Sequence, residues 1–307
     1  MKLAIVSPNA KRLGTLLRGR VGEDVLLAYW DGVGEPEAQV LEAEVVLGAP
    51  DLAAAVMDQL SALRWLQSTW AGVTPLVGQP RRDYLLTGVK GIFGRSMAEY
   101  VLAWVLAEKR SVLRHSSATS WDGRPDKGLA GLHLGIAGIG SIGAEVAQRC
   151  GGFFASVRGL NGDGRTVPGV EHCFGAARRL DFARGLDVLV LLLPDTEATN
   201  QFADKALLEQ LAPGAIVINA GRANALDLDA ALEALSGGRL SSLVLDVLAE
   251  EPLPAEDPLW RTTGVHITSH TAAPTNDEAI VALFLNGLTR YRRGEEPAGR
   301  IDFDRGY

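Results

Sequence analysis

Short apolar runs alternate with helical patterns along most of the 307-residue chain. In the first third, runs of strand length stand between segments with turn residues or helical spacing, such as Asp51–Leu63. Five strands are therefore predicted there: Lys2–Ser7, Val25–Trp30, Glu44–Gly48, Arg64–Ser68 and Tyr84–Thr87. This alternation predicts a small α/β sheet, and this part of the chain carries no glycine fingerprint.

A long amphipathic helix is predicted from Met97 to about Ser111. Its buried stripe comprises Met97, Val101, Trp104, Val105 and Leu106. The helix is followed by a turn-rich stretch, TSWDGRPDKG, which separates it from the next apolar strand.

The second half of the chain predicts a sheet that is buried on both faces. Its candidate strands are Asp187–Leu193, Ile216–Asn219, Leu243–Val247 and His266–Thr268. The runs LDVLVLLLP and AIVIN are apolar on both faces, as parallel strands covered by helices on both sides require. A helix over Asp227–Leu235 should end at Ser236-Gly237-Gly238, and a last helix over Asn276–Arg293 should begin with a capping box of Thr275 and Glu278.

The segment LAGLHLGIAGIGSIG is the most informative motif of the chain. Gly138, Gly140 and Gly143 have the G-x-G-x-x-G spacing, preceded by an apolar strand and followed by the helical segment AEVAQRC. In such a turn the first glycine permits the tight bend, the second lets the backbone approach a pyrophosphate, and the third lets helix and strand pack closely. Glycine-rich turns also serve simple packing, but this context favours a dinucleotide site.

Composition and charge narrow the range of partners. With 47% hydrophobic residues, a net charge of −7 and a pI of about 5.3, the chain is typical of a globular protein and argues against nucleic acid as its main partner. A small anionic substrate needs only local positive charge and remains compatible. The apolar run within the N-terminal MKLAIVSPNA is too short for a signal peptide, and no apolar run in the sequence is long enough to span a membrane. We therefore expect a cytoplasmic protein without a membrane partner.

The cysteines predict neither a disulfide framework nor a metal centre. Cys150 and Cys173 form no C-x-x-C pair, and His172 beside Cys173 lacks further ligands at metal spacing. Two reduced, partly buried thiols and no metal site are expected.

Three ionisable residues follow candidate strands of the second half: Arg222 after AIVINAG, Glu251 after SLVLDVLAE and His270 after VHITS. Ligands of open parallel sheets bind outside the carboxyl ends of the strands, where these residues could converge. Reduction of a 2-oxo acid needs such a set, because arginine binds the carboxylate, histidine protonates the carbonyl oxygen, and a carboxylate orients the histidine and raises its pKa. The alternative is that Arg222 and Glu251 are solvated loop residues and that His270 caps a strand end.

Several segments, in this order, make the chain similar to the D-isomer-specific 2-hydroxyacid dehydrogenases. They are GIAGIGSIG, LLLPDT, INAGRA, LDVLAEEPLP and SHTAA. The early QSTWAGV and LTGVKGIFGRSMAEYVLAWVLA and the closing IDFDRGY resemble the shorter glyoxylate/hydroxypyruvate reductase-like members. The resemblance implies an α/β fold of two Rossmann-like domains with parallel sheets and a cleft between them. Residues 1–96 and 274–307 would form a flavodoxin-like substrate domain, and residues 97–273 the dinucleotide-binding domain.

The resemblance also implies roles for individual residues. Arg222 matches the substrate-binding arginine, Glu251 the glutamate that pairs with the catalytic histidine, and His270 that histidine. Backbone amides of Ala71, Gly72 and Val73 match the loop that contacts the substrate carboxylate, with Trp70 and Trp30 as candidate pocket residues. Further positions are expected to contact the cofactor: Ser141 and Ile142 at the pyrophosphate turn, Pro194 at the adenine, Asp246 at the nicotinamide carboxamide, and Ala220.

The end of the second strand of the dinucleotide domain bears on the choice of cofactor. Asn161 occupies the position at which NAD-preferring members have Asp, and Arg165 could bind a 2′-phosphate. Gly162 stands where similar NADPH-preferring members have Arg, and Asp163 could serve as the acid if the loop folded differently. We expect NADP(H) to be favoured, with NAD(H) possible.

The sequence thus predicts a reductase that transfers hydride from NAD(P)H to a small 2-oxo acid such as glyoxylate or hydroxypyruvate and yields the D-2-hydroxy acid. A homodimer is implied by the resemblance, with the helix from Met97 as a candidate interface. One alternative is a dinucleotide-sensing regulatory protein on the same fold, which the retention of Arg222, Glu251 and His270 disfavours. Another is a Rossmann enzyme with a different nucleotide-like cofactor.

Overall fold

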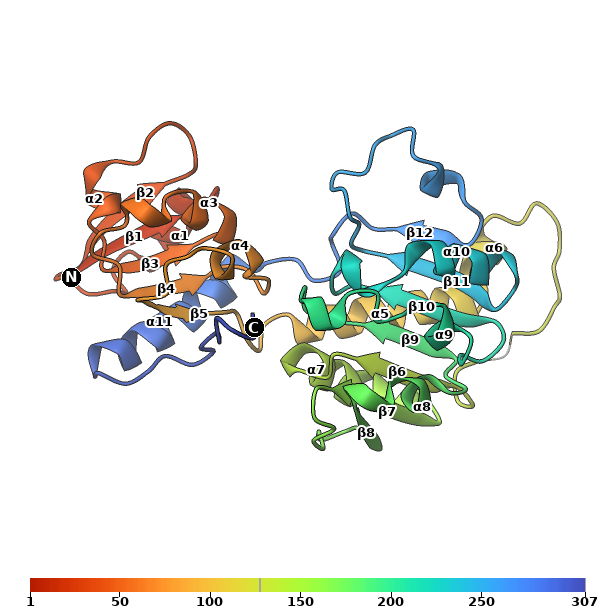
Figure 1. Ribbon diagram of the computed structural model, residues 1–307. Coiled ribbons are helices and arrows are strands. Elements are labelled where there is room, and N and C mark those ends of the chain that lie inside the picture. The colour runs from red at the N-terminus through yellow and green to blue at the C-terminus, as the bar shows by residue number, and fades with distance from the viewer. Residues whose placement is uncertain (127, 307) are drawn as a thin grey trace. The chain divides into compact units, whose positions relative to one another are not determined.

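The computed structural model describes residues 1–126 and 128–306, and the chain separates into two compact units. One unit comprises Met1–Ile92 with Thr275–Tyr307, and the other comprises Phe93–Pro274 (Figure 1). Lys127 in the turn-rich stretch and Tyr307 in the closing IDFDRGY segment lie outside the described residues. Each unit is an α/β domain built on a parallel sheet, which confirms the predicted fold class.

The first unit contains a five-stranded parallel sheet with the order β2-β1-β3-β4-β5. This is the doubly wound order of flavodoxin-like folds. The strands are β1 (Lys2–Val6), β2 (Leu26–Trp30), β3 (Val45–Gly48), β4 (Trp65–Ser68) and β5 (Leu85–Thr87). All five predicted strands of this region are confirmed, each one residue shorter than the apolar run that predicted it.

Helices from both ends of the chain cover this sheet. They are α1 (Ala10–Leu17), α2 (Ala38–Leu41), α3 (Pro50–Ala55), α4 (Thr74–Val77) and α11 (Asp277–Arg292). The buried Trp65 ring of β4 stacks on Phe284 and Tyr291 of α11, at centroid distances of 5.2 and 5.3 Å. These contacts join the C-terminal helix to the first unit. Its cap is the Asn276 side chain, which accepts from the Ala279 N–H, so the predicted capping box starting at Thr275 is wrong.

The segment Asp51–Leu63, expected to be helical or loop, is α-helical only in its first part. The chain leaves α3 after Ala55 and forms a 3₁₀ turn over Met57–Gln59. The Arg81 guanidinium donates to the carbonyl oxygens of Met57, Leu60 and Leu63 at 3.3, 2.6 and 3.4 Å. A side chain distant in sequence thus satisfies carbonyl groups that a continuous helix would bond internally.

The second unit contains a seven-stranded parallel sheet with the order β12-β11-β10-β9-β6-β7-β8. It has the Rossmann strand order with one additional strand beyond the sixth, and the order reverses between β6 and β9. The strands are β6 (His133–Ala137), β7 (Ser156–Asn161), β8 (His172–Gly175), β9 (Val188–Leu191), β10 (Ala215–Asn219), β11 (Leu240–Leu245) and β12 (Val265–Ile267). All of these strands except β8 were predicted.

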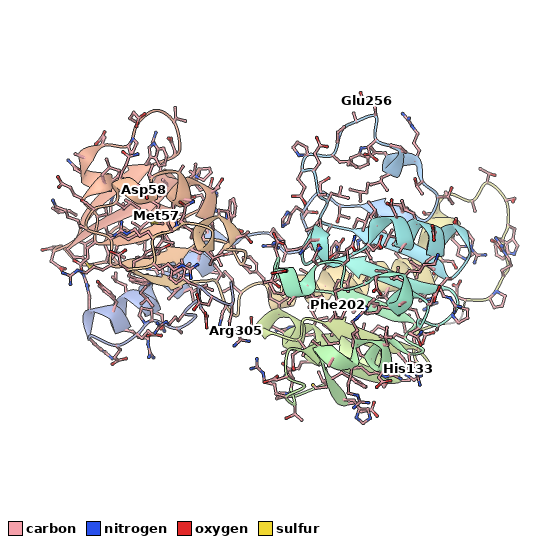
Figure 2. All side chains as sticks on the ribbon, in the orientation of Figure 1. Met57, Asp58, His133, Phe202, Glu256 and Arg305 are labelled. Carbon is pink, nitrogen blue, oxygen red and sulfur yellow. The ribbon has the colours of Figure 1, made fainter. Side chains whose placement is uncertain are left out.

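Alternate residues of the central strands enter two separate cores of this unit. Val188 and Val190 of β9 face the core that contains α5 (Gly94–Lys109) and α7 (Ser141–Cys150). Leu189 and Leu191 face the core that contains α8 (Arg179–Ala183), α9 (Lys205–Leu208) and α10 (Leu228–Ser236). Both faces are therefore covered, as the uninterrupted apolar runs predicted. Met57 and Phe202, labelled in Figure 2, are buried in the cores of the first and second units.

Three helices of the second unit were predicted, namely the long helix, the helix after the glycine turn and the helix over Asp227–Leu235, and their ends are shifted. The α-helices of this unit are α5 (Gly94–Lys109), α6 (Val112–Ser116), α7 (Ser141–Cys150), α8 (Arg179–Ala183), α9 (Lys205–Leu208) and α10 (Leu228–Ser236). The Asp227 side chain caps α10 by accepting from the Ala230 N–H, and Gly237 ends the helix. The long helix starts three residues before the predicted Met97, whose side chain is buried in the core.

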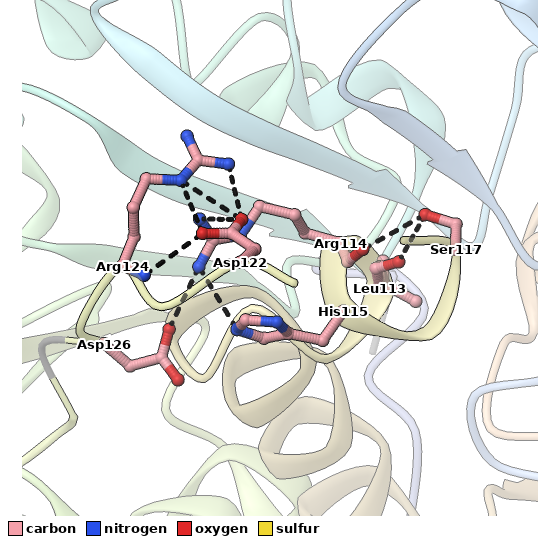
Figure 3. A network of polar contacts seen from close by, with 7 residues as sticks. All are labelled: Leu113, Arg114, His115, Ser117, Asp122, Arg124 and Asp126. Atoms are coloured by element: carbon pink, nitrogen blue, oxygen red, sulfur yellow. Dashed lines mark hydrogen bonds and ion pairs between the residues drawn. The ribbon is translucent and has the colours of Figure 1, made fainter. Parts of the chain in front are cut away.

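A polar network orders the turn-rich stretch after α6 (Figure 3). Arg124 donates to both carboxylate oxygens of Asp122, and Arg114 of α6 contacts the same carboxylate at 3.0 Å and Asp126 at 3.5 Å. The hydrogen bonds from Arg124 hold the pKa of Asp122 well below its usual range. This exposed segment thus has charge pairs that fix its path.

Candidate active site

The three predicted catalytic residues follow adjacent strands at one edge region of the second sheet. Arg222 comes three residues after β10, Glu251 six residues after β11 and His270 three residues after β12. Because these strands are parallel neighbours, their carboxyl ends lie at the same side of the sheet. The fold therefore gathers side chains that are separated by up to 48 positions in the sequence.

His270 and Glu251 form a hydrogen-bonded pair. The His270 Nδ1 lies 2.8 Å from Glu251 Oε2, and the other carboxylate oxygen accepts from the Leu248 N–H at 2.9 Å. A carboxylate only accepts, so Nδ1 carries a proton in this pair. The remaining ring nitrogen, Nε2, is left to exchange a proton with a bound molecule, which is the arrangement of an oriented acid–base histidine.

The Glu251 carboxyl is held in its charged form. Burial raises its pKa, but the hydrogen bonds from His270 and the Leu248 N–H, together with the charges of His270 and Arg222, outweigh burial and lower it. Glu251 is therefore an anion throughout the neutral range, and it accepts a hydrogen bond from the imidazole that it contacts.

Arg222 is a largely buried cation without a carboxylate partner among the described residues. Its Nη1 donates to the Gly221 carbonyl oxygen at 2.6 Å. Burial lowers the pKa of Arg222, although the nearby charges of Asp195 and Glu251 oppose this effect. A buried charge is costly unless it is paired. An incoming carboxylate would supply the missing partner.

Asn219, which sequence reasoning missed, shapes the turn that carries Arg222. It is the last residue of β10, is 1% exposed, and its amide donates to the Arg222 carbonyl oxygen at 3.0 Å and accepts from the Gly221 N–H at 3.3 Å. The signal in the sequence is the single polar residue that ends the apolar run AIVIN. A buried polar side chain at the end of a strand is typical of a turn that must be fixed.

The three fingerprint glycines differ in what surrounds them. Gly138 has φ +93°, and a Cβ there would lie 2.4 Å from the Leu192 carbonyl oxygen. A Cβ at Gly143 would lie 2.6 Å from the Gly138 carbonyl oxygen. At Gly140, apart from the two adjoining residues, no atom of the described part of the chain lies within 4 Å of such a Cβ. Protein packing thus explains two of the glycines, whereas the third keeps open a space that a ligand can approach.

The helix N-terminus beside this open space suits a pyrophosphate. Gly140 precedes α7, which begins at Ser141, and no side chain caps the helix. The first N–H groups of an uncapped helix, together with its dipole, bind anions. Ser141 and Ile142 lie in this first turn, as predicted, so the described residues fit a dinucleotide.

Pro194 and Ala220 lie next to the point where the strand order reverses. Pro194 follows β9 and its carbonyl oxygen accepts from Thr199 Oγ1 at 2.6 Å, and Ala220 follows β10 with its N–H on the Leu191 carbonyl oxygen. The two turns are in close contact, since a Cβ at Gly221 would lie 2.8 Å from the Leu193 nitrogen. These positions are where an open sheet binds its ligand.

Asn161 organises the loop that follows β7. Its Oδ1 accepts from the Gly164 N–H at 2.6 Å, and its Nδ2 donates to the Arg165 carbonyl oxygen at 2.9 Å. Asp163 accepts from the Arg165 N–H at 3.2 Å, whereas the Arg165 side chain is exposed. The Arg158 guanidinium already donates to the carbonyl oxygens of residues 182 and 184 of the same domain. Arg165 is therefore the better candidate for a 2′-phosphate.

Asp246, directly after β11, holds the segment that contains His270. Its carboxylate, 3% exposed, accepts from the N–H groups of Thr271 and Ala272 and from Thr268 Oγ1, and its carbonyl oxygen accepts from the His270 N–H at 2.7 Å. Ser269 and His270 have φ of +54° and +58°. Non-glycine residues in this region are strained by about 1–3 kcal/mol each and persist where their surroundings enforce it.

The remaining predicted residues belong to the first unit. Trp70, Ala71, Gly72 and Val73 form the turn between β4 and α4. Ser68 Oγ accepts from the Trp70 N–H at 3.0 Å and donates to its carbonyl oxygen at 2.7 Å, which fixes the start of the turn. Trp70 is 40% exposed. The role of this turn in substrate binding stays a prediction.

Other features limit the possible chemistry. Cys150 is buried and Cys173 partly buried, and both are free thiols, as predicted. Over residues 1–126 and 128–306, no group of three or more His, Cys, Asp or Glu side chains is placed to hold a metal ion. In the same residues we find no helix with the length and apolar character that crossing a bilayer requires.

Comparison with known proteins identifies the class. Residues 102–272 match the family model for the D-isomer specific 2-hydroxyacid dehydrogenase, NAD binding domain. The chain belongs to this family and is an NAD(P)-dependent oxidoreductase.

Individual relatives agree with this. The chain is 34% identical over 216 residues to glyoxylate/hydroxypyruvate reductase A of Serratia proteamaculans, covering 69% of each protein. A D-isomer specific 2-hydroxyacid dehydrogenase family protein from Aeromonas salmonicida has a similar crystal structure, with a TM-score of 0.90, 33% identity and coverage of 98% of this chain and 99% of that one. The NADPH-dependent glyoxylate/hydroxypyruvate reductase of Sinorhizobium meliloti, solved with NADP and sulfate, has a TM-score of 0.86 at 25% identity and full coverage of both chains.

The glycine environments give a direct test of the dinucleotide site. Gly140 has φ −83°, which suits any residue, so Gly140→Ala should leave the melting temperature within about 2 °C while weakening NADPH binding at least about tenfold. Gly143→Ala is the matched control, because its Cβ would meet backbone and should destabilise the domain. Titration of NADPH fluorescence and thermal unfolding measure both effects. Unchanged NADPH affinity in Gly140→Ala would place the pyrophosphate elsewhere.

Proposed function

We propose that this enzyme reduces a small 2-oxo acid of the glyoxylate or hydroxypyruvate type to the D-2-hydroxy acid, with NADPH as the favoured cofactor. The observation that carries the proposal is the 2.8 Å contact between His270 and Glu251 at a sheet end that also bears the unpaired cation of Arg222. The named relatives, which include two glyoxylate/hydroxypyruvate reductases, support the substrate class.

His270 would provide the proton of the reduction. Its Nδ1 is engaged by Glu251, so the proton that reaches the carbonyl oxygen comes from Nε2. Glu251 stabilises the protonated imidazole before the transfer and fixes the plane of the ring. After the transfer the neutral imidazole keeps its Nδ1 proton, and solvent restores the proton on Nε2.

Arg222 would bind the substrate carboxylate and orient the carbonyl group. Its guanidinium offers parallel N–H donors that match a carboxylate, and the pair that it forms relieves the cost of its own burial. A cofactor bound at the glycine fingerprint would supply a hydride to the carbonyl carbon. With the His270 proton on the oxygen, the oxo group would become a hydroxyl.

Cofactor oxidation, followed at the nicotinamide absorbance with a panel of 2-oxo acids, tests the proposal. Turnover is expected with glyoxylate and hydroxypyruvate. A protein that binds NADPH but oxidises it with none of the panel would instead support a dinucleotide-sensing role.

The Glu251→Gln variant should shift the pH profile of reduction. Reduction needs the protonated imidazole and declines as pH rises. The lowered pKa of Glu251 keeps this residue negative at neutral pH, where it favours protonated His270. Without that charge the proton is lost more readily, so the decline should begin at lower pH. The profile of kcat/KM against pH measures this, with Glu250→Gln, an exposed neighbour, as the control. Identical profiles in both variants would contradict the pairing.

NADPH should have a higher kcat/KM than NADH at fixed glyoxylate. A neutral Asn161 removes the repulsion that an acid would exert on a 2′-phosphate, and the exposed Arg165 supplies positive charge nearby. Arg165→Ala should lower kcat/KM for NADPH by about fivefold or more and leave that for NADH unchanged. Arg20→Ala, an exposed arginine of the first unit, serves as the control. A preference of the unaltered enzyme for NADH would overturn this cofactor assignment.

We also propose a homodimer formed through α5 and the adjoining segment. This segment exposes apolar side chains that water disfavours, with Val112 50%, Leu113 40% and Trp121 97% exposed. Light scattering gives the mass of the particle and distinguishes two chains from one.

A further inference from the structure

A chain of hydroxyl groups connects helix α5 to the turn that carries His270. Tyr100 Oη lies 2.7 Å from Thr268 Oγ1, and Thr268 Oγ1 lies 2.6 Å from Asp246 Oδ1. Tyr100 comes from α5, Thr268 directly follows β12, and Asp246 directly follows β11. Three elements far apart in the sequence thus meet in one hydrogen-bonded line.

The direction of the donors follows from the chemistry of these groups. A carboxylate only accepts hydrogen bonds, so the Thr268 hydroxyl donates its single hydrogen to Asp246. The Thr268 oxygen must therefore accept a hydrogen bond from the Tyr100 hydroxyl. Burial raises the pKa of the Tyr100 phenol well above its usual range, so that it keeps the proton that it donates. The line runs from Tyr100 through Thr268 to Asp246, and Thr268 Oγ1 both accepts and donates within it.

The two oxygens of Asp246 are used unequally. Oδ1 accepts from Thr268 Oγ1, from the Thr271 N–H at 2.8 Å and from the Ala272 N–H at 3.1 Å, whereas Oδ2 accepts from the Ala272 N–H alone. A carboxylate that is free to rotate could exchange these positions. The hydroxyl of Thr268 distinguishes the two oxygens, because it donates to Oδ1 and not to Oδ2.

The Tyr100 end of the line is fixed by packing on α5. Its ring meets Trp104 edge to face at 6.5 Å, and the Trp104 ring lies over His266 of β12 at 4.8 Å. His266 Nε2 in turn lies 3.1 Å from Glu108 Oε1, on the same helix. Helix and strand are therefore joined by further contacts one and two turns along α5 from Tyr100, which hold the donor of Thr268 in place.

We propose that Thr268 and Tyr100 are positioning residues, which fix the Asp246 carboxylate so that Oδ1 holds the left-handed turn of Ser269 and His270 while Oδ2 remains available to the cofactor. The effect that we expect on kcat rests on the proposed function. Neither hydroxyl needs to touch substrate or cofactor, since both act through Asp246. Loss of either hydroxyl should loosen the turn and misplace the imidazole relative to the bound oxo acid.

The test compares Thr268→Val, which replaces the hydroxyl by a methyl group, with Thr268→Ser, which keeps it. Thr268→Val should lower kcat by about ten- to a hundredfold, the cost of a small misplacement of a reacting group, with KM for glyoxylate changed less than about threefold. Thr268→Ser should restore most of kcat. Thr289→Val, which removes an exposed hydroxyl on α11, is the matched control and should behave as the unaltered enzyme.

Hydrogen–deuterium exchange of residues 268–274 supplies a readout that does not depend on activity. Thr268→Val and Tyr100→Phe should both speed exchange in this segment, and Thr268→Ser should not. If Thr268→Val does not fold, Tyr100→Phe decides the question, because it keeps the ring packing. The proposal would be overturned if Tyr100→Phe or Thr268→Val had the exchange and kcat of the unaltered protein. It would also be overturned if Thr268→Ser were as impaired as Thr268→Val. If the unaltered enzyme showed no turnover, the proposed function would be refuted. The exchange rates of residues 268–274 would still test whether Thr268 and Tyr100 hold the turn.

Discussion

Replacing His270 by alanine should lower kcat for 2-oxo acid reduction by about a hundredfold or more, the usual contribution of a general acid. The side chain is held by Glu251 at 2.8 Å, and its Nε2 is the proton donor in the proposed reaction. NADPH binding should change little, since the fingerprint glycines lie on another turn. Steady-state cofactor oxidation at saturating glyoxylate measures kcat, and NADPH fluorescence measures binding.

His172→Ala is the matched control for this variant. His172 lies on the edge strand β8 with its side chain 68% exposed, and its loss should leave kcat unchanged. If His270→Ala retained more than a tenth of the activity, another group would be the proton donor and the assignment of His270 would be wrong.

Replacing Arg222 by alanine should raise KM for the 2-oxo acid by about ten- to a hundredfold and also lower kcat. Hydrogen bonds to charged groups contribute about 1.5–3 kcal/mol each, and every 1.4 kcal/mol corresponds to a tenfold change. The effect on KM comes from the lost carboxylate contact, and the effect on kcat from poorer orientation of the carbonyl group. Initial rates over a range of glyoxylate concentrations separate the two.

Arg222→Lys and Arg184→Ala complete the experiment. Lysine keeps the charge but not the paired donors, so it should recover only part of the loss. Arg184 has a side chain that is 72% exposed, and its removal should have no effect on KM. An Arg222→Ala variant with unchanged KM would show that the substrate carboxylate is bound elsewhere.

Much of the fold could be predicted because its decisive signals are local. The apolar runs of β9 and β10 fix buried parallel strands, and the spacing of Gly138, Gly140 and Gly143 fixes the turn after β6. The catalytic candidates could be predicted for a similar reason, since residues that follow parallel strands meet at one side of the sheet. The carboxyl-end rule therefore links Arg222, Glu251 and His270 without a structure.

The features that sequence reasoning missed depend on distant partners. Strand β8 is four residues long, partly exposed, and forms only by pairing at the edge of the sheet beside β7. Arg81 binds the carbonyl oxygens of Met57, Leu60 and Leu63, which lie 18 to 24 positions away in the sequence. The Tyr100–Thr268 contact joins residues 168 positions apart. No local pattern reports such contacts, because each side chain alone is an ordinary member of its helix or strand.

The stereochemistry of the product tests the central claim most directly. Hydroxypyruvate and NADPH should be incubated with the purified enzyme, and the glycerate formed should be resolved on a chiral column. The proposed function is reduction to the D-2-hydroxy acid, so the account predicts D-glycerate with oxidation of one NADPH for each molecule formed. L-glycerate, a mixture of both isomers, or no glycerate would contradict it.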